Sequence, residues 1–356
     1  MSWKKLNEYV DMWGKPVLGT ENQENGERFM GLTIDPTSKN PYRGIARQII
    51  YREGSPDVPG YLDISKLIVV ESYDLLSWKI LGDLKINGIQ EIINDLISKN
   101  EKFIGLEDPD ILVDENGKKH VYFTIAFRYN KKIIDSNNNL SDVVLNEIYL
   151  GHAEGKNFDD LIATKPILKR FNSEIVGFKE VCPLFFNSNE NKLILTETFV
   201  DRNKMGYSAI SIIEAKDFSN KWNYKKLVHD PLKETKHWCM EHSSPCRIFN
   251  PKFLSHKKYL VGIMNGRENS RIVMDKKVYG KFRPGLFLFD IKRMEIVWID
   301  DNPLFEDPVA TTITFASDMV YLNKNEVILY AHPNDSFVRA YKLKLSKIKE
   351  LLPKDI

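Results

Sequence analysis

The sequence predicts an all-β protein, a five-bladed β-propeller with a short C-terminal helix. Runs rich in Val, Ile, Tyr, Phe and Thr that end in turn residues dominate the chain, which is typical of many short strands. Similar strand-rich segments recur roughly every 65–75 residues, a period typical of propeller blades with about four strands each. Five such units fill most of the 356 residues. The alternative from pattern alone is a pair of non-repetitive β-sandwiches.

Five segments are the strongest strand candidates. They are residues 46–54 (ARQIIYREG), 119–128 (KHVYFTIAFR), 191–199 (NKLILTETF), 257–266 (KKYLVGIMNG) and 325–333 (NEVILYAHP). Four of them follow a shorter run that ends in a turn, which predicts a β-hairpin in each case. These shorter runs are DPDILVDENG, CPLFFNSNEN, NPKFLSHK and SDMVYLNKN.

Helical patterns are few, and the best are residues 88–100 and 345–352. No linker rich in Gly, Pro or Ser divides the chain, so we expect one propeller domain over residues 43–356. Residues 1–42 match no repeat, and we expect them to form an N-terminal arm that packs on a neighbouring blade or subunit.

Composition argues against several classes of partner. The chain has 51 basic and 49 acidic residues, a formal charge of +2, and its Lys residues are spread out, so we expect no nucleic-acid binding. The first residues lack an apolar signal region, and no stretch approaches about 18 apolar residues, so we expect no membrane insertion. Cys182, Cys239 and Cys246 have neither C-x-x-C nor zinc spacing and fit free thiols in a cytoplasmic protein.

A propeller predicts where a site would form, because the innermost strands of all blades converge on one central channel. The same place in each repeat yields Arg52 and Glu53; Glu107, Asp108 and Asp110; Lys179 and Glu180; Glu241, His242 and Ser244; and Asp318, His332, Asn334 and Asp335. Convergent carboxylates with Arg, His and Asn suit glycoside chemistry. One carboxylic acid protonates the leaving oxygen while a second group or an external anion attacks the anomeric carbon.

The segment GLEDPDI (105–111), taken with this repeat pattern, resembles the Gly-Val-Glu-Asp-Pro-Arg-Ile motif of glycoside hydrolase family 130, the mannoside phosphorylases and related β-mannosidases. Weaker similarities to that family follow in order along the chain: IIYREG, ESYDLLSW, KEVCPLFF, HSSPCRI with YLVGIMNG, and ILYAHPNDS. The resemblance covers residues 43–352. It implies a five-bladed propeller and cleavage of β-mannoside-like bonds in a glycoside or oligosaccharide, by inverting hydrolysis or phosphorolysis.

The resemblance also implies roles for individual residues. Asp108 matches the general acid, and burial beside Glu107 would raise its pKa toward the working pH. Arg52 matches a clamp for sugar or phosphate, and Asp335 matches a late substrate-binding Asp. Lys179 stands where the phosphorylases hold inorganic phosphate, so phosphate is a potential co-substrate and no other cofactor is expected. Without the resemblance, Asp108 and Asp335 would be interpreted as acidic residues of turns, and Arg52 as part of a surface ion pair.

The chain departs from the family pattern at several of these places. Glu180 follows Lys179 where the family prefers Asn or Asp, and a carboxylate there would repel a phosphate dianion. Asp110 replaces the Arg of the motif. If water is the nucleophile, an inverting enzyme needs a second carboxylate to activate it, and Glu180 and Glu241 are the candidates.

Other polar residues complete the predicted site. His242, His332 and Asp318 are candidates for binding sugar hydroxyls, and Trp238 is a candidate for stacking on a sugar ring. No cluster of His, Asp and Glu has metal-ligand spacing, so we expect no metal. Two further functions stay open: a glycosyltransferase that builds a surface or storage glycan on the same scaffold, and a glycan-binding propeller without turnover. A homo-oligomer also stays open.

Overall fold

The computed structural model describes residues 2–21, 26–134, 140–184, 191–202, 205–219 and 221–355. In this part of the chain, 23 strands accompany two short α-helices, α1 (Ile89–Leu96) and α2 (Leu345–Leu351). The predictions of an all-β chain and of a short C-terminal helix are therefore confirmed. Helix α1 lies within the predicted 88–100 segment.

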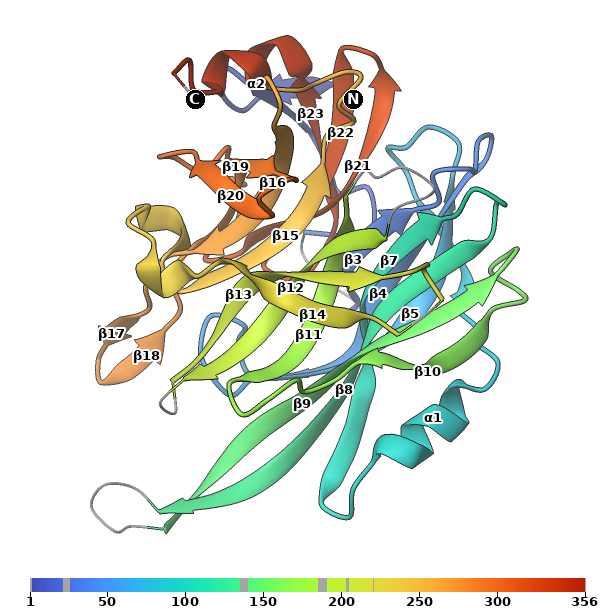
Figure 1. Cartoon of the computed structure of the whole chain (residues 1–356), viewed down its shortest axis with the longest axis vertical. Helices are drawn as coiled ribbons and strands as arrows, with labels where there is room; N and C mark the ends of the chain where they lie inside the picture. Colours follow the sequence, from blue (N-terminus) through green and yellow to red (C-terminus); the bar gives the residue numbers. More distant parts are fainter. Residues whose placement is uncertain are drawn as a thin grey trace.

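Antiparallel pairing sorts most strands into five successive groups (Figure 1). The first contains β3 (Arg28–Ile34), β4 (Tyr42–Glu53), β5 (Leu62–Ser72) and β6 (Lys79–Asp83). The second contains β7 (Glu101–Val113), β8 (Lys119–Ile134), β9 (Leu140–Gly155) and β10 (Ile162–Leu168). The third contains β11 (Ile175–Pro183), β12 (Lys192–Arg202), β13 (Met205–Ala215) and β14 (Asn223–His229).

The fourth group contains β15 (His242–Ile248), β16 (Leu260–Arg267), β19 (Phe282–Asp290) and β20 (Glu295–Ile299). The fifth contains β21 (Thr314–Asn323), β22 (Glu326–Pro333) and β23 (Arg339–Lys344), extended by β2 (Val10–Trp13) and β1 (Trp3–Lys5). Strands β17 (Arg271–Val273) and β18 (Lys276–Val278) form a separate hairpin that projects beside the fourth group (Figure 1).

The first strands of the five groups pack against one another in a cycle. Strand β3 packs against β7, β7 against β11, β11 against β15, β15 against β21, and β21 against β3. Hydrogen bonding follows a different division, because single parallel bridges join the first group to the second and the third to the fourth. No sheet formed by the described residues closes on itself. The five-blade count therefore stays an interpretation, and the cyclic packing favours it.

The strongest predicted strands correspond to β4, β8, β12, β16 and β22, the second strand of each group. Residues 105–110 lie within β7, the first strand of its group, which pairs with β8 as the predicted hairpin requires. One local assignment was wrong. The run NPKFLSHK, expected as a strand, connects β15 to β16, because β15 already ends at Ile248.

The N-terminal residues take part in two sheets. Strand β2 pairs with β23, with Val10 opposite Leu343, and β1 pairs with β2. Strand β3 then pairs with β4. Both chain ends consequently lie near α2 in Figure 1. The domain boundary predicted after residue 42 stays untested, although strands from both sides of it share sheets.

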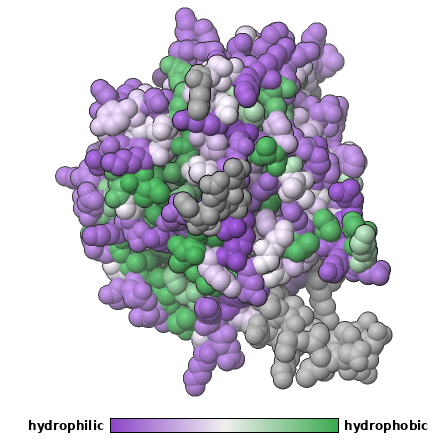
Figure 2. Space-filling model, turned by 180° about the vertical axis from the view of Figure 1, so that it is seen from behind, coloured by the Kyte–Doolittle hydropathy of each residue, from purple (hydrophilic) through white to green (hydrophobic). Residues whose placement is uncertain are grey.

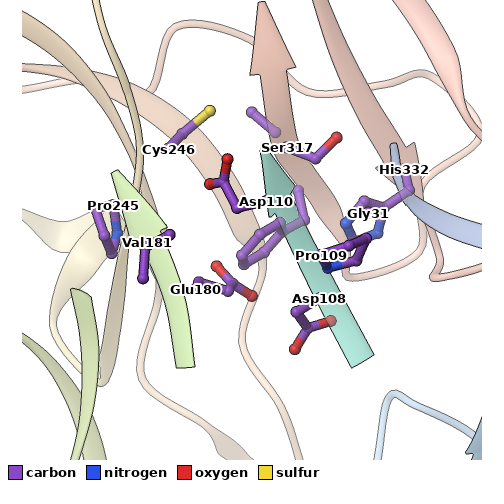
Figure 3. A pocket seen from close by; sticks show the side chains of 12 residues that line it. Gly31, Asp108, Pro109, Asp110, Glu180, Val181, Pro245, Cys246, Ser317 and His332 are labelled. Atoms are coloured by element: carbon purple, nitrogen blue, oxygen red, sulfur yellow. The ribbon is translucent and has the colours of Figure 1, made fainter. Parts of the chain in front are cut away.

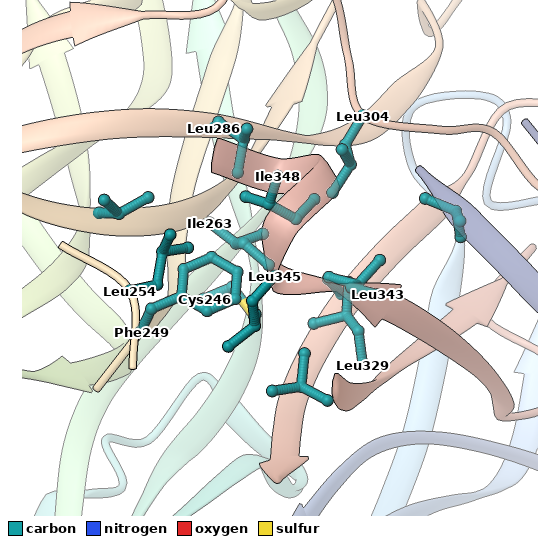
Figure 4. Close-up of a cluster of buried hydrophobic side chains, with 14 of the residues drawn as sticks. Cys246, Phe249, Leu254, Ile263, Leu286, Leu304, Leu329, Leu343, Leu345 and Ile348 are labelled. Atoms are coloured by element: carbon teal, nitrogen blue, oxygen red, sulfur yellow. The ribbon is translucent and has the colours of Figure 1, made fainter. Parts of the chain in front are cut away.

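The apolar core consists of clusters between neighbouring groups. One cluster joins the fourth and fifth groups and receives Leu345 and Ile348 of α2 (Figure 4). Its members include Ile263, Leu286, Leu329 and Leu343, all nearly inaccessible to solvent. Each such side chain stabilises the fold by about 1.5–3 kcal/mol through burial, so α2 helps to hold the two groups together.

The face opposite that of Figure 1 is largely hydrophilic, with hydrophobic side chains gathered over part of it (Figure 2). Neither α-helix in the described residues combines the length and apolar character needed to cross a lipid bilayer.

Candidate functional site

A register shift occurs in the first strand of every group, against the second strand. The shifts lie at residues 30–33, 107–110, 179–181, 245–247 and 316–318. Such bulges bend a strand and change the direction of its side chains. At two of them a carboxylate residue has a left-handed backbone, with φ of 47° at Asp108 and 44° at Glu180. Non-glycine residues rarely adopt this conformation, which clusters at functional sites.

Two connected spaces lie at these bulges. A narrow one of about 30 Å³, enough for a water molecule, is lined by residues from all five shifts, including Gly31, Asp108, Glu180, Cys246 and Ser317 (Figure 3). A wider cavity of about 570 Å³ adjoins it. Asp108, Glu180, His332 and Phe315 line both spaces and so form the floor of the wider cavity.

Arg47 holds the two acids of the GLEDPD segment. Its guanidinium donates to Asp108 Oδ1 at 3.0 Å, to Glu107 Oε1 at 2.8 Å and to the Ser65 hydroxyl at 3.1 Å. Burial raises the pKa of Glu107 to about 7, although Arg47 opposes the shift. The sequence analysis missed Arg47. The available signal was the position of Arg47 inside the largely apolar first half of β4, where residues 44–46 and Ile49 are buried.

Lys179 lies at the centre of three carboxylates. Its ammonium is 3.6 Å from Asp108 Oδ2, 3.7 Å from Glu180 Oε1 and 3.6 Å from Glu197 Oε1. The Asp108 and Glu180 oxygens are therefore at most about 7.3 Å apart, the sum of their two distances to Lys179. Ser244 donates to the other oxygen of Glu180. Burial raises the pKa of Glu180 well above its usual range despite the nearby ammonium.

Glu197, which the sequence analysis also missed, supports this arrangement from β12. Its side chain is fully buried, and its Oε1 lies 3.0 Å from His242 Nε2. Burial would raise the pKa of Glu197, but His242 and Lys179 together lower it to about 2. His242, a candidate for binding substrate, lines the wider cavity, and its Nε2 faces Glu197.

His332 and Asp335 form a pair on another side of the cavity. His332 Nδ1 lies 2.9 Å from Asp335 Oδ1, and both residues line the wider cavity. Burial opposes ionisation of Asp335, but His332 and Arg52 lower its pKa. Arg52 itself makes two bonds to Asp63, at 2.7 and 2.6 Å, and donates to the Asp335 carbonyl at 3.1 Å. The described residues that line the two spaces do not include Arg52.

Arg247 lies beside Asp110 and Val181, which line the narrow space, and contacts the first strand of each other group. It donates to both oxygens of Asp110, each at 2.6 Å, and to Asp318 Oδ1 at 2.6 Å. Longer contacts reach the Val181 carbonyl and the Thr33 hydroxyl, both at 3.3 Å. Asp318, predicted to bind substrate, is thus part of a buried ion-pair network that also includes Asp110.

Two other candidates lie away from the floor. Glu241 accepts hydrogen bonds from the Ser270 hydroxyl and backbone and lies 3.1 Å from Lys277 Nζ. In the part of the chain that the structure describes, Glu241 lines neither space. Trp238, a candidate for sugar stacking, is 1% exposed and donates to the Asp300 carbonyl at 2.9 Å. It packs inside the fourth group instead.

Aromatic side chains surround the wider cavity above its charged floor. They are Tyr61, Phe199, Tyr207, Tyr279 and Phe282. Arg267 lies over the ring of Tyr279, 4.2 Å from its centroid. At the rim, the Asp57 carbonyl accepts from the Tyr279 backbone N–H at 2.8 Å, which ties the loop after β4 to the fourth group. A charged floor with aromatic walls can hold a saccharide by hydrogen bonds and by ring stacking.

Comparisons with known proteins identify the fold. No protein-family model matches the sequence, and no curated protein matches it. Solved structures do match: β-1,2-mannobiose phosphorylase from Listeria innocua is 11% identical with a TM-score of 0.61, covering 98% of this chain and 94% of its own. A mannose phosphorylase from Leishmania mexicana is 12% identical with a TM-score of 0.54, covering 95% and 90%. A family 117 glycoside hydrolase from Zobellia galactanivorans is 11% identical with a TM-score of 0.57, covering 96% and 91%. The chain therefore shares the fold of propeller-type glycoside hydrolases and phosphorylases.

Proposed function

We propose that this protein is a carbohydrate-active enzyme, a divergent relative of glycoside hydrolase family 130, that cleaves β-mannoside-like bonds. The observation that carries the proposal is the pair of carboxyl groups, Asp108 and Glu180, on left-handed bulges at the floor of one cavity. A volume of about 570 Å³ lies within the range of small-molecule sites and suits a short oligosaccharide. The fold shared with phosphorylases and glycoside hydrolases supports this reading.

Asp108 and Glu180 are the proposed acid–base pair. Inverting enzymes separate their two carboxyl groups by about 6.5–9.5 Å, and retaining enzymes by about 5–5.5 Å. The upper limit of about 7.3 Å between the two Lys179-facing oxygens allows an inverting pair. In this proposal Asp108 protonates the leaving oxygen, as the sequence resemblance implies, and Glu180 activates the nucleophile. Glu241 is the weaker candidate base, because among the described residues it lines neither space and its carboxylate is held by Ser270 and Lys277.

One observation favours the reverse assignment of the same pair. Burial raises the pKa of Glu180 well above its usual range, which favours the protonated form of that carboxyl. Asp108 instead lies between two cations, Arg47 and Lys179. A carboxyl that retains its proton is suited to general acid catalysis, so Glu180 is the second candidate for the proton donor.

Water is the proposed nucleophile rather than phosphate. Lys179, the residue expected to hold phosphate, already lies within 3.7 Å of three carboxylates. Arg52, the other expected anion ligand, is paired with Asp63. A phosphate dianion beside Lys179 would approach Asp108 and Glu180 and be repelled by both when they are ionised.

The product of manno-oligosaccharide cleavage tests this proposal. Purified protein is incubated with β-linked manno-oligosaccharides with and without inorganic phosphate. Hydrolysis releases free sugar at a rate independent of phosphate, whereas formation of a sugar 1-phosphate would contradict the choice of nucleophile. Turnover of a nucleotide-sugar donor would indicate a glycosyltransferase, and saccharide affinity without any product would indicate a binding protein.

The leaving group distinguishes the two assignments of the acid. Loss of the general acid slows cleavage of a poor leaving group far more than cleavage of an activated aryl glycoside, because the aryl oxide needs little protonation. We expect this pattern for Asp108→Asn and a uniform loss on both substrates for Glu180→Gln. The opposite pattern would assign the acid to Glu180. Glu241→Gln is the matched control and should keep the wild-type rate on both.

A further inference from the structure

A second cluster of ionisable side chains lies outside the catalytic cavity, on one face of the second group. His120 on β8 is directly opposite Glu154 on β9, and His152 precedes Glu154 by two residues. Residues two apart on a strand share a face, so all three side chains project to the same side of the sheet. His120 and His152 are 2% and 0% exposed, and the Phe218 ring covers His120 from the third group. Burial of the two imidazoles is costly unless their nitrogens have partners, and Glu154 beside them is only half-buried.

The two imidazoles face each other through their inner nitrogens. His120 Nδ1 lies 3.1 Å from His152 Nε2, and Glu154 Oε2 lies 3.8 Å from His120 Nδ1. Tetrahedral Zn²⁺ binds imidazole nitrogen at about 2.0–2.1 Å, which separates two ligand nitrogens by about 3.3 Å. Small movements of the existing side chains would therefore give two nitrogens and one carboxylate oxygen around one ion.

The outer nitrogens of the rings indicate which tautomers are present. His120 Nε2 lies 3.6 Å from Asp114 Oδ2, and the acceptor-only carboxylate favours the tautomer with its proton on this nitrogen. His152 Nδ1 lies 2.9 Å from the Thr164 hydroxyl. That hydroxyl has one proton and lies 3.3 Å from the Lys165 carbonyl and 3.4 Å from the His152 carbonyl, to which it can donate. When Thr164 donates to one of these carbonyls it accepts from His152 Nδ1, and in that arrangement both inner nitrogens present lone pairs to each other.

We propose that His120 Nδ1, His152 Nε2 and Glu154 Oε2 form a binding site for a divalent transition-metal ion, with Zn²⁺ as the best-fitting ion. Two facing lone pairs repel unless a cation lies between them. Asp114 and Thr164 supply the outer contacts that orient metal-binding histidines. The Ser219 hydroxyl donates to Glu154 Oε2, and Lys118 Nζ lies 3.2 Å from Glu154 Oε1. Because none of the three ligands lines either described cavity, the ion is structural and joins the second group to the loop at Ser219.

This site departs from the expectation of no metal. That expectation relied on spacing along the sequence, and His120 and His152 are brought together only by the β8–β9 register. It is independent of the proposed catalytic chemistry. A second grouping of His229, Glu234 and Cys239 also has atoms close enough for a metal, although its one measured contact is longer, 4.0 Å between His229 Nδ1 and Glu234 Oε2.

Metal content of the untagged full chain tests the proposal. The protein is stripped with a chelator, incubated with Zn²⁺, freed of excess ion by gel filtration and analysed for zinc, and affinity is measured by calorimetry. We expect one Zn²⁺ per chain and loss of that ion in His152→Ala. Asp114→Asn, which leaves the ligands in place, should weaken binding about 10–100-fold. His237→Ala at an exposed histidine and Cys239→Ser in the other grouping should bind as the wild type does.

Three results would overturn the site. They are a wild-type chain that retains no zinc, equal retention by the His152→Ala variant, and loss of zinc in Cys239→Ser. If His152→Ala does not fold, the proposal is tested by the zinc affinity of Asp114→Asn and by the visible spectrum of the cobalt-substituted wild type. Co²⁺ in the proposed site gives a visible spectrum of tetrahedral nitrogen and oxygen ligation. Unchanged affinity in Asp114→Asn, or a spectrum with a thiolate band, contradicts the proposal.

Discussion

Replacing Arg247 with Met should destabilise the protein strongly. The Arg247 guanidinium bonds to Asp110 and Asp318 through three contacts of 2.6 Å, and those two residues are 6% and 4% exposed. The Met side chain fills much of the same volume but leaves both carboxylates buried without their cation. Removing one partner of a buried ion pair costs about 3–5 kcal/mol, so we expect the free energy of unfolding to fall by about that amount.

The expected change in melting temperature follows from the size of the chain. Unfolding entropy near the midpoint is about 2.1 cal/mol/K per residue, which gives roughly 0.75 kcal/mol/K for a chain of this length. A loss of about 3–5 kcal/mol therefore lowers the melting temperature by about 4–7 °C. Urea unfolding followed by tryptophan fluorescence gives the free energy independently, with an unchanged m value showing that the folded state keeps its compactness.

Two further variants identify the cause. Arg247→Lys keeps the charge but loses the two-pronged contact with Asp110, so its loss should be smaller than that of Arg247→Met. Adding Asp110→Asn to Arg247→Met removes one unpaired carboxylate and should recover part of the lost stability. Wild-type stability in Arg247→Met, or a double variant less stable than Arg247→Met at neutral pH, would refute the ion-pair network as a stabilising element of the channel.

Three other predictions follow from the same contacts. Lys179→Met should reduce turnover by more than 100-fold and move the pH–rate profile, because the ammonium contacts Asp108, Glu180 and Glu197; an unchanged profile would contradict a role in the site. Glu107 has a pKa of about 7 in the folded protein against 4.5 ordinarily, so its contribution to stability is present below pH 4.5 and lost as pH rises through 7. Glu107→Gln should remove that decline of roughly 3 kcal/mol, measured by urea unfolding at pH 4.5 and 8, and an equally steep decline in the variant would contradict it. Arg52→Lys should raise KM more than it lowers kcat, because it loosens the Asp335 turn, and unchanged kinetics would restrict Arg52 to its pair with Asp63.

The strand content was predictable because it is local. Runs of β-branched and aromatic residues favour a strand, and the five strongest strand segments all overlap described strands. The order of strands from the axis outward was not predictable in this way. The GLEDPD segment has the proline and acidic residues of a turn, yet a bulge between Glu107 and Asp110 keeps it inside β7. A bulge depends on pairing with a neighbouring strand, which one segment of sequence does not specify.

The choice of arginine in the first group shows the same limit within the site. Arg47 and Arg52 both lie on β4, and the motif resemblance favoured Arg52. A register shift between Ile49 and Tyr51 separates the two positions, so an alternation counted from one arginine does not predict the side taken by the other. Arg47 contacts Asp108, whereas Arg52 pairs with Asp63 in the next strand. Glu197 was missed for a different reason: a fully buried glutamate within an apolar strand gives no sequence signal of its partners.

Asp110 links these observations to the chemistry. Asp110 stands where the family motif has an arginine, two residues after the proposed acid Asp108, and this difference first indicated an altered reaction. In the structure, however, the two carboxylates have separate partners: Asp108 contacts Arg47 and Lys179, while both oxygens of Asp110 bond to Arg247. An arginine at position 110 would confront Arg247, so Asp110 and Arg247 are expected to vary together. The departure therefore concerns the narrow end of the channel, and the argument for water as the nucleophile depends on Lys179 and its three carboxylates instead.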